Sequence, residues 1–165
     1  MRPVPHTPRR SPVAPRGASG TEASADGPAP LRDYVTGLDP RGLLEQRLST
    51  LLPIGKPLAM VIVDVIGLKA VNEQEGFLAG DALLRAAADR LRDVATESAI
   101  VARLGGDELV AVFLGDKAGE SAQRAADALA RAASQPGLRA ASLAAAEAET
   151  SAEFIERLYA TLRRS

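Results

Sequence analysis

The stretch that most constrains the fold is 99–113, where two apolar segments rich in β-branched residues flank the pair Gly105 and Gly106. This arrangement predicts a β-hairpin, because glycine accepts the positive φ angles of a tight primed turn. Two carboxylates, Asp107 and Glu108, follow the glycines directly. Carboxylate oxygens suit a hard divalent cation such as Mg²⁺, and a glycine beside them lets a phosphate approach the backbone closely. The sequence therefore predicts a hairpin that carries a site for a metal and a phosphate.

Composition limits the chemistry available to the folded part of the chain. Its 165 residues suffice for one domain, and the formal net charge of −1 gives no global sign of a nucleic-acid partner. There is no cysteine, and the single histidine is His6, in a proline-rich segment. Disulfides, cysteine-ligated zinc and Ser-His or Cys-His catalysis are therefore excluded from the expected folded part. Carboxylates, Lys, Arg and bound ions remain as catalytic groups.

We expect a cytoplasmic protein with a disordered N-terminal arm and no membrane partner. No apolar run is long enough to span a bilayer, and the N-terminus lacks the apolar core of a signal peptide. Residues 1–30 hold seven of the eleven prolines, and four arginines precede the first acid, Glu22. Such a segment cannot bury a core, so it is either a solvated tail or a basic arm that docks on an acidic partner. Residues 31–165 form the expected folded domain.

Strand and helix patterns alternate along residues 31–165. Asp39 and Pro40 suit the N-cap and the first position of a helix that carries a leucine stripe. The other expected elements are a buried strand at 58–65, a helix at 69–75, a helix from near Gly80 and Asp81, the hairpin, a helix at 121–133, a strand at 138–144 and a final helix opened by a capping box at 150–153. This alternation predicts an α/β fold with a mixed central sheet flanked by helices.

An acid near the end of the buried strand is the second indication of a metal site. Asp64 stands in an otherwise apolar run, where a carboxylate is costly unless it is paired or ligates a metal. The alternative is a cap or turn residue for the segment that follows. If strand 58–65 neighbours the hairpin, Asp64, Asp107 and Glu108 meet at one edge of the sheet. Three carboxylates in that arrangement resemble a two-metal site for phosphoryl transfer.

Four stretches in order carry a resemblance to a known family. They are D-Y-V-T-G-L-D-P-R at 33–41, D-V-I-G-L-K-A-V-N-E at 64–73, G-F-L-A-G-D at 76–81 and G-G-D-E-L at 105–109. They resemble the patterns D-x-L-T-G-L-x-N-R, D-x-D-x-F-K-x-x-N-D, G-H-x-x-G-D and G-G-D-E-F of the GGDEF family, the diguanylate cyclases. A lone Gly-Gly-Asp-Glu arises easily by chance, whereas four motifs in family order are specific.

The resemblance implies a sheet like that of polymerase palms and nucleotidyl cyclases. It implies a nucleotidyltransferase in signalling, in which two GTP molecules, one per subunit of a homodimer, condense to cyclic di-GMP and release pyrophosphate. Asp64, Asp107 and Glu108, with the Val65 carbonyl, would hold Mg²⁺ or Mn²⁺. Asp107 would also lie close to the attacking ribose 3′-hydroxyl, with Glu108 assisting. Dimerisation would bring the two nucleotides face to face, which is the proximity contribution to catalysis.

The same resemblance implies substrate-binding roles for Lys69, Asn72, Asp81, Gly105 and Gly106. Lys69, with the backbone near Gly67 and Leu68, would hold phosphates. Asn72 and Asp81 would recognise guanine, since a carboxylate accepts from its N1 and N2 hydrogens and an amide donates to O6. Taken singly, Asn72 and Asp81 are equally explained as local caps and Lys69 as a solvated side chain.

The chain departs from the family patterns at several positions. Ile66 replaces the second acid of D-x-D. The C-terminal L-Y-x-A-K pattern aligns with Leu158 and Tyr159, which puts Leu162 at the phosphate-binding lysine, with Arg163 and Arg164 near enough to substitute. A lost charge-assisted phosphate contact costs about 1.5–3 kcal/mol, so we expect weaker GTP binding. Thr96 and Ala99 stand where the family often has the R-x-x-D of product inhibition, and we expect no feedback there.

Three interpretations follow from the sequence. The first is a working diguanylate cyclase. The second is a degenerate GGDEF domain that binds GTP or a regulatory protein partner and acts without catalysis, as the altered C-terminal motif and Ile66 suggest. No sensory domain is recognisable, so the input would come from a partner or from the arm. The third is an unrelated α/β domain, which strand order excludes if Asp64 lies beside Asp107.

Overall fold

The computed structural model describes residues 31–131 and 136–165, so the expected arm at 1–30 and the end of the helix expected at 121–133 lie outside the described residues. The elements are β1 (Asp39–Pro40), α1 (Arg41–Leu51), the 3-10 turn η1 (Leu52–Ile54), β2 (Leu58–Val65), α2 (Leu68–Glu75), α3 (Phe77–Val94), β3 (Ile100–Arg103), β4 (Glu108–Leu114), α4 (Ala118–Arg131), β5 (Leu138–Ala144) and α5 (Ser151–Leu162). No described helix is long and apolar enough to cross a membrane.

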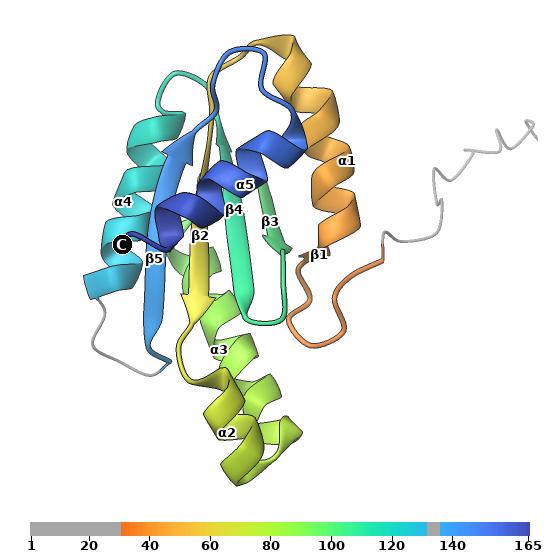
Figure 1. Ribbon diagram of the computed structural model, residues 1–165, viewed down its shortest axis with the longest axis vertical. Helices are drawn as coiled ribbons and strands as arrows, with labels where there is room; N and C mark the ends of the chain where they lie inside the picture. The colour runs from red at the N-terminus through yellow and green to blue at the C-terminus, as the bar shows by residue number, and fades with distance from the viewer. Residues whose placement is uncertain (1–30, 132–135) are drawn as a thin grey trace, which may run out of the picture.

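The strands form one mixed five-stranded sheet in the order β1-β3-β4-β2-β5. Among the described strands only β1 and β3 pair in parallel, while β2 pairs antiparallel with both β4 and β5. Helices α3 and α4 cover one face of the sheet and α1 and α5 the other, and α2 projects beyond the sheet at the end where β2 finishes (Figure 1). The α/β fold with helices on both faces, predicted from the alternating patterns, is confirmed.

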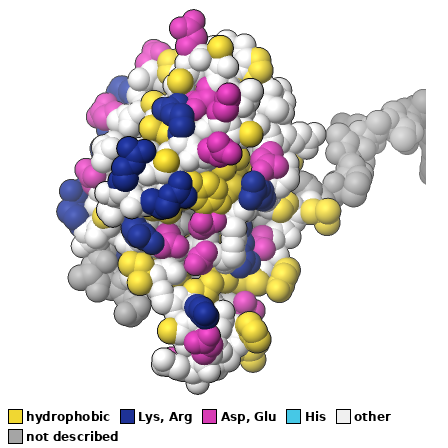
Figure 2. All heavy atoms as spheres, viewed as in Figure 1, with side chains coloured by type: hydrophobic (Ala, Val, Ile, Leu, Met, Phe, Trp, Pro, Cys, Tyr) yellow, Lys and Arg dark blue, Asp and Glu magenta, His cyan; other side chains and the backbone are white. Residues whose placement is uncertain are grey.

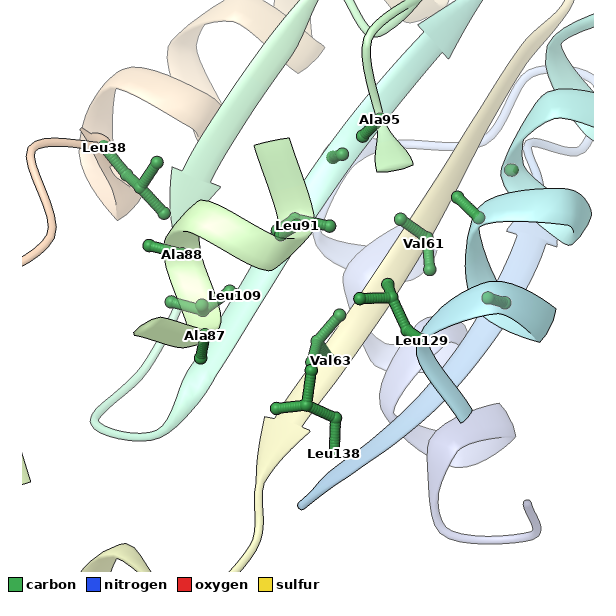
Figure 3. Packing of buried hydrophobic residues seen from close by; sticks show 14 of the residues in the cluster. Leu38, Val61, Val63, Ala87, Ala88, Leu91, Ala95, Leu109, Leu129 and Leu138 are labelled. Carbon is green, nitrogen blue, oxygen red and sulfur yellow. The ribbon is translucent and has the colours of Figure 1, made fainter. Parts of the chain in front are cut away.

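Strand β2 lies at the centre of both hydrophobic layers. Its odd-numbered residues, such as Val61 and Val63, pack with Leu91 of α3 and Leu129 of α4 (Figure 3). Its even-numbered residues, such as Ile62, pack beneath α1 and α5. Side chains of a strand alternate between the two faces, so a strand covered on both sides must be apolar almost throughout. This double burial fixes the register of β2 and thereby the position of Asp64 near its end.

The helix boundaries correct two sequence predictions. Pro40, not Asp39, is the N-cap of α1, and it makes no side-chain cap bond. Asp39 is instead buried in β1 and forms ion pairs with Arg32 and Arg47, because two cations hold a carboxylate more strongly than a helix end does. Helix α3 begins at Phe77 rather than near Gly80, since Gly76 at φ 89° separates α2 from α3. Asp81 is therefore not a cap but lies inside α3.

The hairpin is confirmed, but its turn differs from the prediction. Strands β3 and β4 are joined by residues 104–107, and neither Gly105 nor Gly106 is among the glycines at positive φ. The N–H groups of Leu104 and Gly105 both donate to the Glu108 carbonyl, at 2.8 and 3.2 Å. The constraint at Gly105 is one of space, because an added Cβ would meet Oε2 of Glu108 and force that side chain to shift. A longer loop has replaced the two-residue primed turn.

Candidate functional site

Three charged side chains lie in a row at the end of the sheet from which α2 projects. Asp64 of β2 is the register partner of Glu108 on β4 and of Arg139 on β5. Directly opposed residues of antiparallel strands project from the same face, so these three side chains share the face that α1 and α5 cover. The preceding even-numbered residue of β2, Ile62, packs on that same face, which confirms the assignment.

Each carboxylate of the row is engaged by another side chain. Arg139 donates from Nη2 to Oδ2 of Asp64 at 2.7 Å, with the aspartate side chain 18% exposed and the arginine 47%. The Tyr159 hydroxyl on α5 donates to Oε2 of Glu108 at 2.7 Å. The pKa of Tyr159 is raised to about 12, mainly by burial and then by its hydrogen bond to Glu108 and the negative charge of that carboxylate. The phenol therefore stays protonated at neutral pH and remains a donor to Glu108.

Arg103 holds the loop between β3 and β4 against the start of the domain. Its Nε and Nη2 atoms donate to the carbonyls of Gly105 and Gly106 at 3.1 and 2.6 Å, and Nη1 pairs with the Asp33 carboxylate at 3.1 Å. Burial alone would raise the pKa of Asp33, but hydrogen bonds from Thr36 and the charge of Arg103 outweigh it and lower that pKa. The first predicted motif and the Gly-Gly motif are thus joined by one guanidinium.

A pocket of about 520 Å³ opens between this loop and α2. Its lining residues are Leu68, Lys69, Asn72, Glu73, Phe77, Gly106 and Asp107. Asn72 packs closely against α3, where a Cβ on Gly80 would collide with its Oδ1 atom. Phe77 lies at the pocket with 79% of its surface exposed. A larger hollow of about 900 Å³ lies between residues 146–149 and α5. Of the side chains that contact the carboxylates or the loop, Tyr159 alone lines it.

The structure brings most of the predicted site residues to one end of the sheet. Asp64 and Glu108 are cross-strand neighbours, and the Val65 N–H donates to the Asp107 carbonyl at 2.9 Å. Asp107 shares the pocket with Lys69 and Asn72, the two predicted substrate ligands of α2. Asp81 is not a lining residue of that pocket, although it directly follows Gly80.

The donor chemistry of this end of the sheet fits a hard divalent cation. Asp64, Glu108 and Asp107 supply oxygen ligands of the type that Mg²⁺ prefers. Among residues 31–131 and 136–165, however, no three acidic or histidine side chains are already gathered as a metal cluster. Arg139 and Tyr159 each occupy one oxygen of these two carboxylates, so a cation that binds there either uses the other oxygen or displaces the partner.

Sequence reasoning missed three contributors to the site: Arg139, Arg103 and the hydroxyl of Tyr159. The partners of Arg139 and Arg103 lie 75 and 70 residues away in the chain. One signal for Arg139 was present, because it is the only charged residue in the strand L-R-A-A-S-L-A. A lone cation in an otherwise small and apolar strand predicts an acidic neighbour on the adjoining strand.

The chain matches the family model described as "Diguanylate cyclase, GGDEF domain" over residues 31–154. It is 39% identical over 99 residues to an uncharacterized signaling protein of Caulobacter vibrioides, covering 56% of this chain and 12% of that protein. It is 37% identical over 99 residues to the diguanylate cyclase TpbB of Pseudomonas aeruginosa, covering 58% and 23%. The chain thus spans less than a quarter of the length of either relative.

Solved structures agree with the fold. The GGDEF domain of TpbB matches at 30% identity and a TM-score of 0.67, covering 82% of this chain and 90% of that one. A sensory box/GGDEF family protein from Caulobacter crescentus matches at 30% identity and a TM-score of 0.65, covering 81% and 96%. The GGDEF domain of DgcB from the same organism, solved in complex with c-di-GMP, matches with a TM-score of 0.67 at 20% identity, covering 81% of this chain and 88% of that one. At this identity the match shows likeness of fold alone.

Proposed function

The chain belongs to the GGDEF family, and we propose that it is a diguanylate cyclase that condenses two GTP molecules to cyclic di-GMP. Each ribose 3′-hydroxyl attacks the α-phosphate of the other nucleotide, so that two P–O bonds form and two pyrophosphates leave. The observation that carries the proposal is the pocket in which Asp107 of the β3–β4 loop shares a lining with Lys69 and Asn72 of α2. These residues stand on two motifs of the family, the stretch at 64–73 and the Gly-Gly-Asp-Glu stretch at 105–109.

The proposed metal ligands are Asp64, Asp107, Glu108 and the carbonyl of Val65. When bound, Mg²⁺ or Mn²⁺ would polarise the phosphate and neutralise charge on the leaving pyrophosphate. Asp107 would also lie beside the attacking hydroxyl. Arg103 holds the backbone of the loop that carries Asp107 and leads into Glu108 at the start of β4, so this backbone is already positioned.

The proposed substrate ligands lie on α2 and α3. Lys69 extends into solvent at the pocket and would bind phosphates together with the backbone at Gly67 and Leu68, where α2 begins. Asn72 and Asp81 would recognise the guanine edge. Gly105 and Gly106 would let the nucleotide approach the loop. Each pocket would hold one GTP, so the reaction needs a homodimer that brings two pockets face to face.

A second candidate function is regulation by a GGDEF domain that binds GTP or a protein partner without turnover. The observation that favours it is Leu162, which stands where the family pattern has lysine and is only 5% exposed in the core beneath α5. The exposed cations at the C-terminal end of α5 are Arg163 and Arg164, for both candidate functions. For comparison, the diguanylate cyclase SiaD of Pseudomonas aeruginosa has been solved in complex with its activator SiaC, and it resembles this chain in fold.

Incubation of the purified chain with GTP and Mg²⁺, followed by chromatography of the nucleotides, separates the two candidates. The cyclase proposal expects cyclic di-GMP from the natural chain and none from Asp107→Asn. Asp116→Asn removes the same charge from an exposed loop and is expected to retain activity. If calorimetry shows that GTP binds but no product forms at any protein concentration, the cyclase proposal fails and the regulatory one stands.

A further inference from the structure

Arg139 occupies an unusual position for a surface arginine. It is the only charged residue of β5, and its register partner is Asp64, the proposed metal ligand on the central strand. Within the described part of the chain, its hydrogen bond goes from Nη2 to Oδ2 of Asp64 at 2.7 Å. Nearly half of the arginine side chain is exposed, whereas Asp64 is mostly buried. The guanidinium therefore lies on the solvent side of the carboxylate.

Arg139 provides a counter-charge for Asp64, whereas Arg41 is the cation that interacts with Glu108. The two carboxylates are cross-strand neighbours, and like charges directly opposed destabilise a sheet. A guanidinium has five N–H donors, of which one contacts Asp64 here, so its remaining donors can bind other anions. On the face shown in Figure 2, positive and negative side chains are interspersed around α5.

The site also lacks a cation where the family pattern has one. Leu162 is buried in the apolar layer under α5 and cannot contact a phosphate. Arg164 lies at the C-terminal end of α5, where its Nε donates to the carbonyl of Ala160 rather than to a carboxylate of the row. Arg139, by contrast, is next to the carboxylate that would hold the metal and hence the nucleotide's phosphates.

We propose that Arg139 is an exchangeable counter-ion, which Asp64 releases to a substrate phosphate when a divalent cation binds. The cation takes the place of the guanidinium on Asp64, and the guanidinium binds a phosphate oxygen of the nucleotide. Arginine suits this exchange because its long side chain is mobile when exposed and its planar fork matches both carboxylate and phosphate. The proposal rests on the proposed function for its ligand, a nucleoside triphosphate with a divalent cation.

The exchange predicts effects of opposite sign on two affinities. In Arg139→Gln, the cation no longer competes with the guanidinium, so Mn²⁺ alone binds more tightly. The same variant lacks a phosphate ligand, so a non-hydrolysable GTP analogue binds more weakly at saturating Mn²⁺. Each change is expected to be about tenfold, which corresponds to about 1.4 kcal/mol. Arg139→Lys keeps the charge and is expected to restore part of the nucleotide affinity.

The test measures Mn²⁺ binding by electron paramagnetic resonance and nucleotide binding by calorimetry on the full chain. Arg131→Gln, which removes an exposed arginine of α4 at the far side of the sheet, is the matched control and is expected to change neither affinity. Circular dichroism verifies that each variant is folded. Tighter binding of Mn²⁺ together with weaker binding of the GTP analogue in Arg139→Gln supports the exchange.

Two results would overturn the proposal. If both affinities of Arg139→Gln stay within twofold of the natural chain, Arg139 is an ordinary surface residue, and the proposed function survives if the natural chain still makes product. If both affinities fall together, Arg139 only supports the structure of the site. A natural chain that binds no GTP analogue at all refutes the proposed function itself, and the exchange with it.

Discussion

Arg103→Gln tests whether one guanidinium holds the Gly-Gly loop in place. The substitution removes the contacts from Arg103 to Asp33 and to the carbonyls of Gly105 and Gly106. Breaking a fully buried ion pair costs about 3–5 kcal/mol and an exposed one about 0–1 kcal/mol. The side chains of Arg103 and Asp33 are 18% and 16% exposed, so they lie between these limits. We therefore expect a loss of about 2–3 kcal/mol in the free energy of unfolding.

Urea and thermal denaturation followed by circular dichroism measure this loss. For a domain of this size the expected fall in Tm is about 8–12 °C. Arg124→Gln breaks ion pairs of α4 whose side chains are more than half exposed, and we expect it to cost less than about 1 kcal/mol. A double-mutant cycle with Asp33→Asn isolates the ion pair from the two carbonyl contacts. If Arg103→Gln costs no more than Arg124→Gln, the loop is not held as described.

The same pair has a pH signature. The pKa of Asp33 is lower in the folded chain than its ordinary value of 3.8. Its contribution to stability is therefore present above that value and is lost as the pH falls through the lower folded pKa. In Asp33→Asn this acid-dependent part of the stability disappears, while stability near neutral pH is already reduced. Equal acid sensitivity of the two proteins would contradict the assigned role of Asp33.

Three further predictions concern the site. Gly105→Ala places a methyl group against Glu108, so we expect cyclic di-GMP formation to fall at least about tenfold with little change in Tm, measured by chromatography and circular dichroism. Burial and the bond to Glu108 hold the pKa of Tyr159 high, so Tyr159→Phe removes the ultraviolet tyrosinate transition expected near pH 12 and Glu108→Gln shifts it to lower pH. A transition unchanged in both variants would show that it does not belong to Tyr159. Added cyclic di-GMP is expected neither to bind near Thr96 and Ala99 nor to inhibit turnover, and product inhibition that is lost on substitution at either position would contradict this.

Local sequence patterns predicted the fold well where burial alone decides the structure. The strand at 58–65 is covered on both faces, so its apolar run leaves no alternative register, and β2 matches it. Strand β5 also matches the prediction at 138–144, because its alanines fit against α4 and α5. The capping box that opens α5 is likewise present, with Thr150 and Glu153 bonded reciprocally.

The failures share one physical cause, which is that contacts distant in sequence override local preferences. Asp39 is a good N-cap by residue type, but two arginines bind its carboxylate instead. Glycine is typical of a helix boundary, yet Gly80 lies inside α3, where a Cβ would collide with the side chain of Asn72. The lone arginine of β5 indicated an acidic neighbour but could not identify it as Asp64, since strand order alone brings β5 beside β2.

The measurement that tests the proposed function most directly is the rate of cyclic di-GMP formation at increasing concentrations of the purified chain with GTP and Mg²⁺. A homodimeric cyclase predicts that the rate per chain rises with protein concentration until dimers dominate, with two pyrophosphates released for each cyclic di-GMP. Asp107→Asn should abolish product at every concentration. GTP binding without any product, at concentrations where the chain is dimeric, would contradict the proposed function.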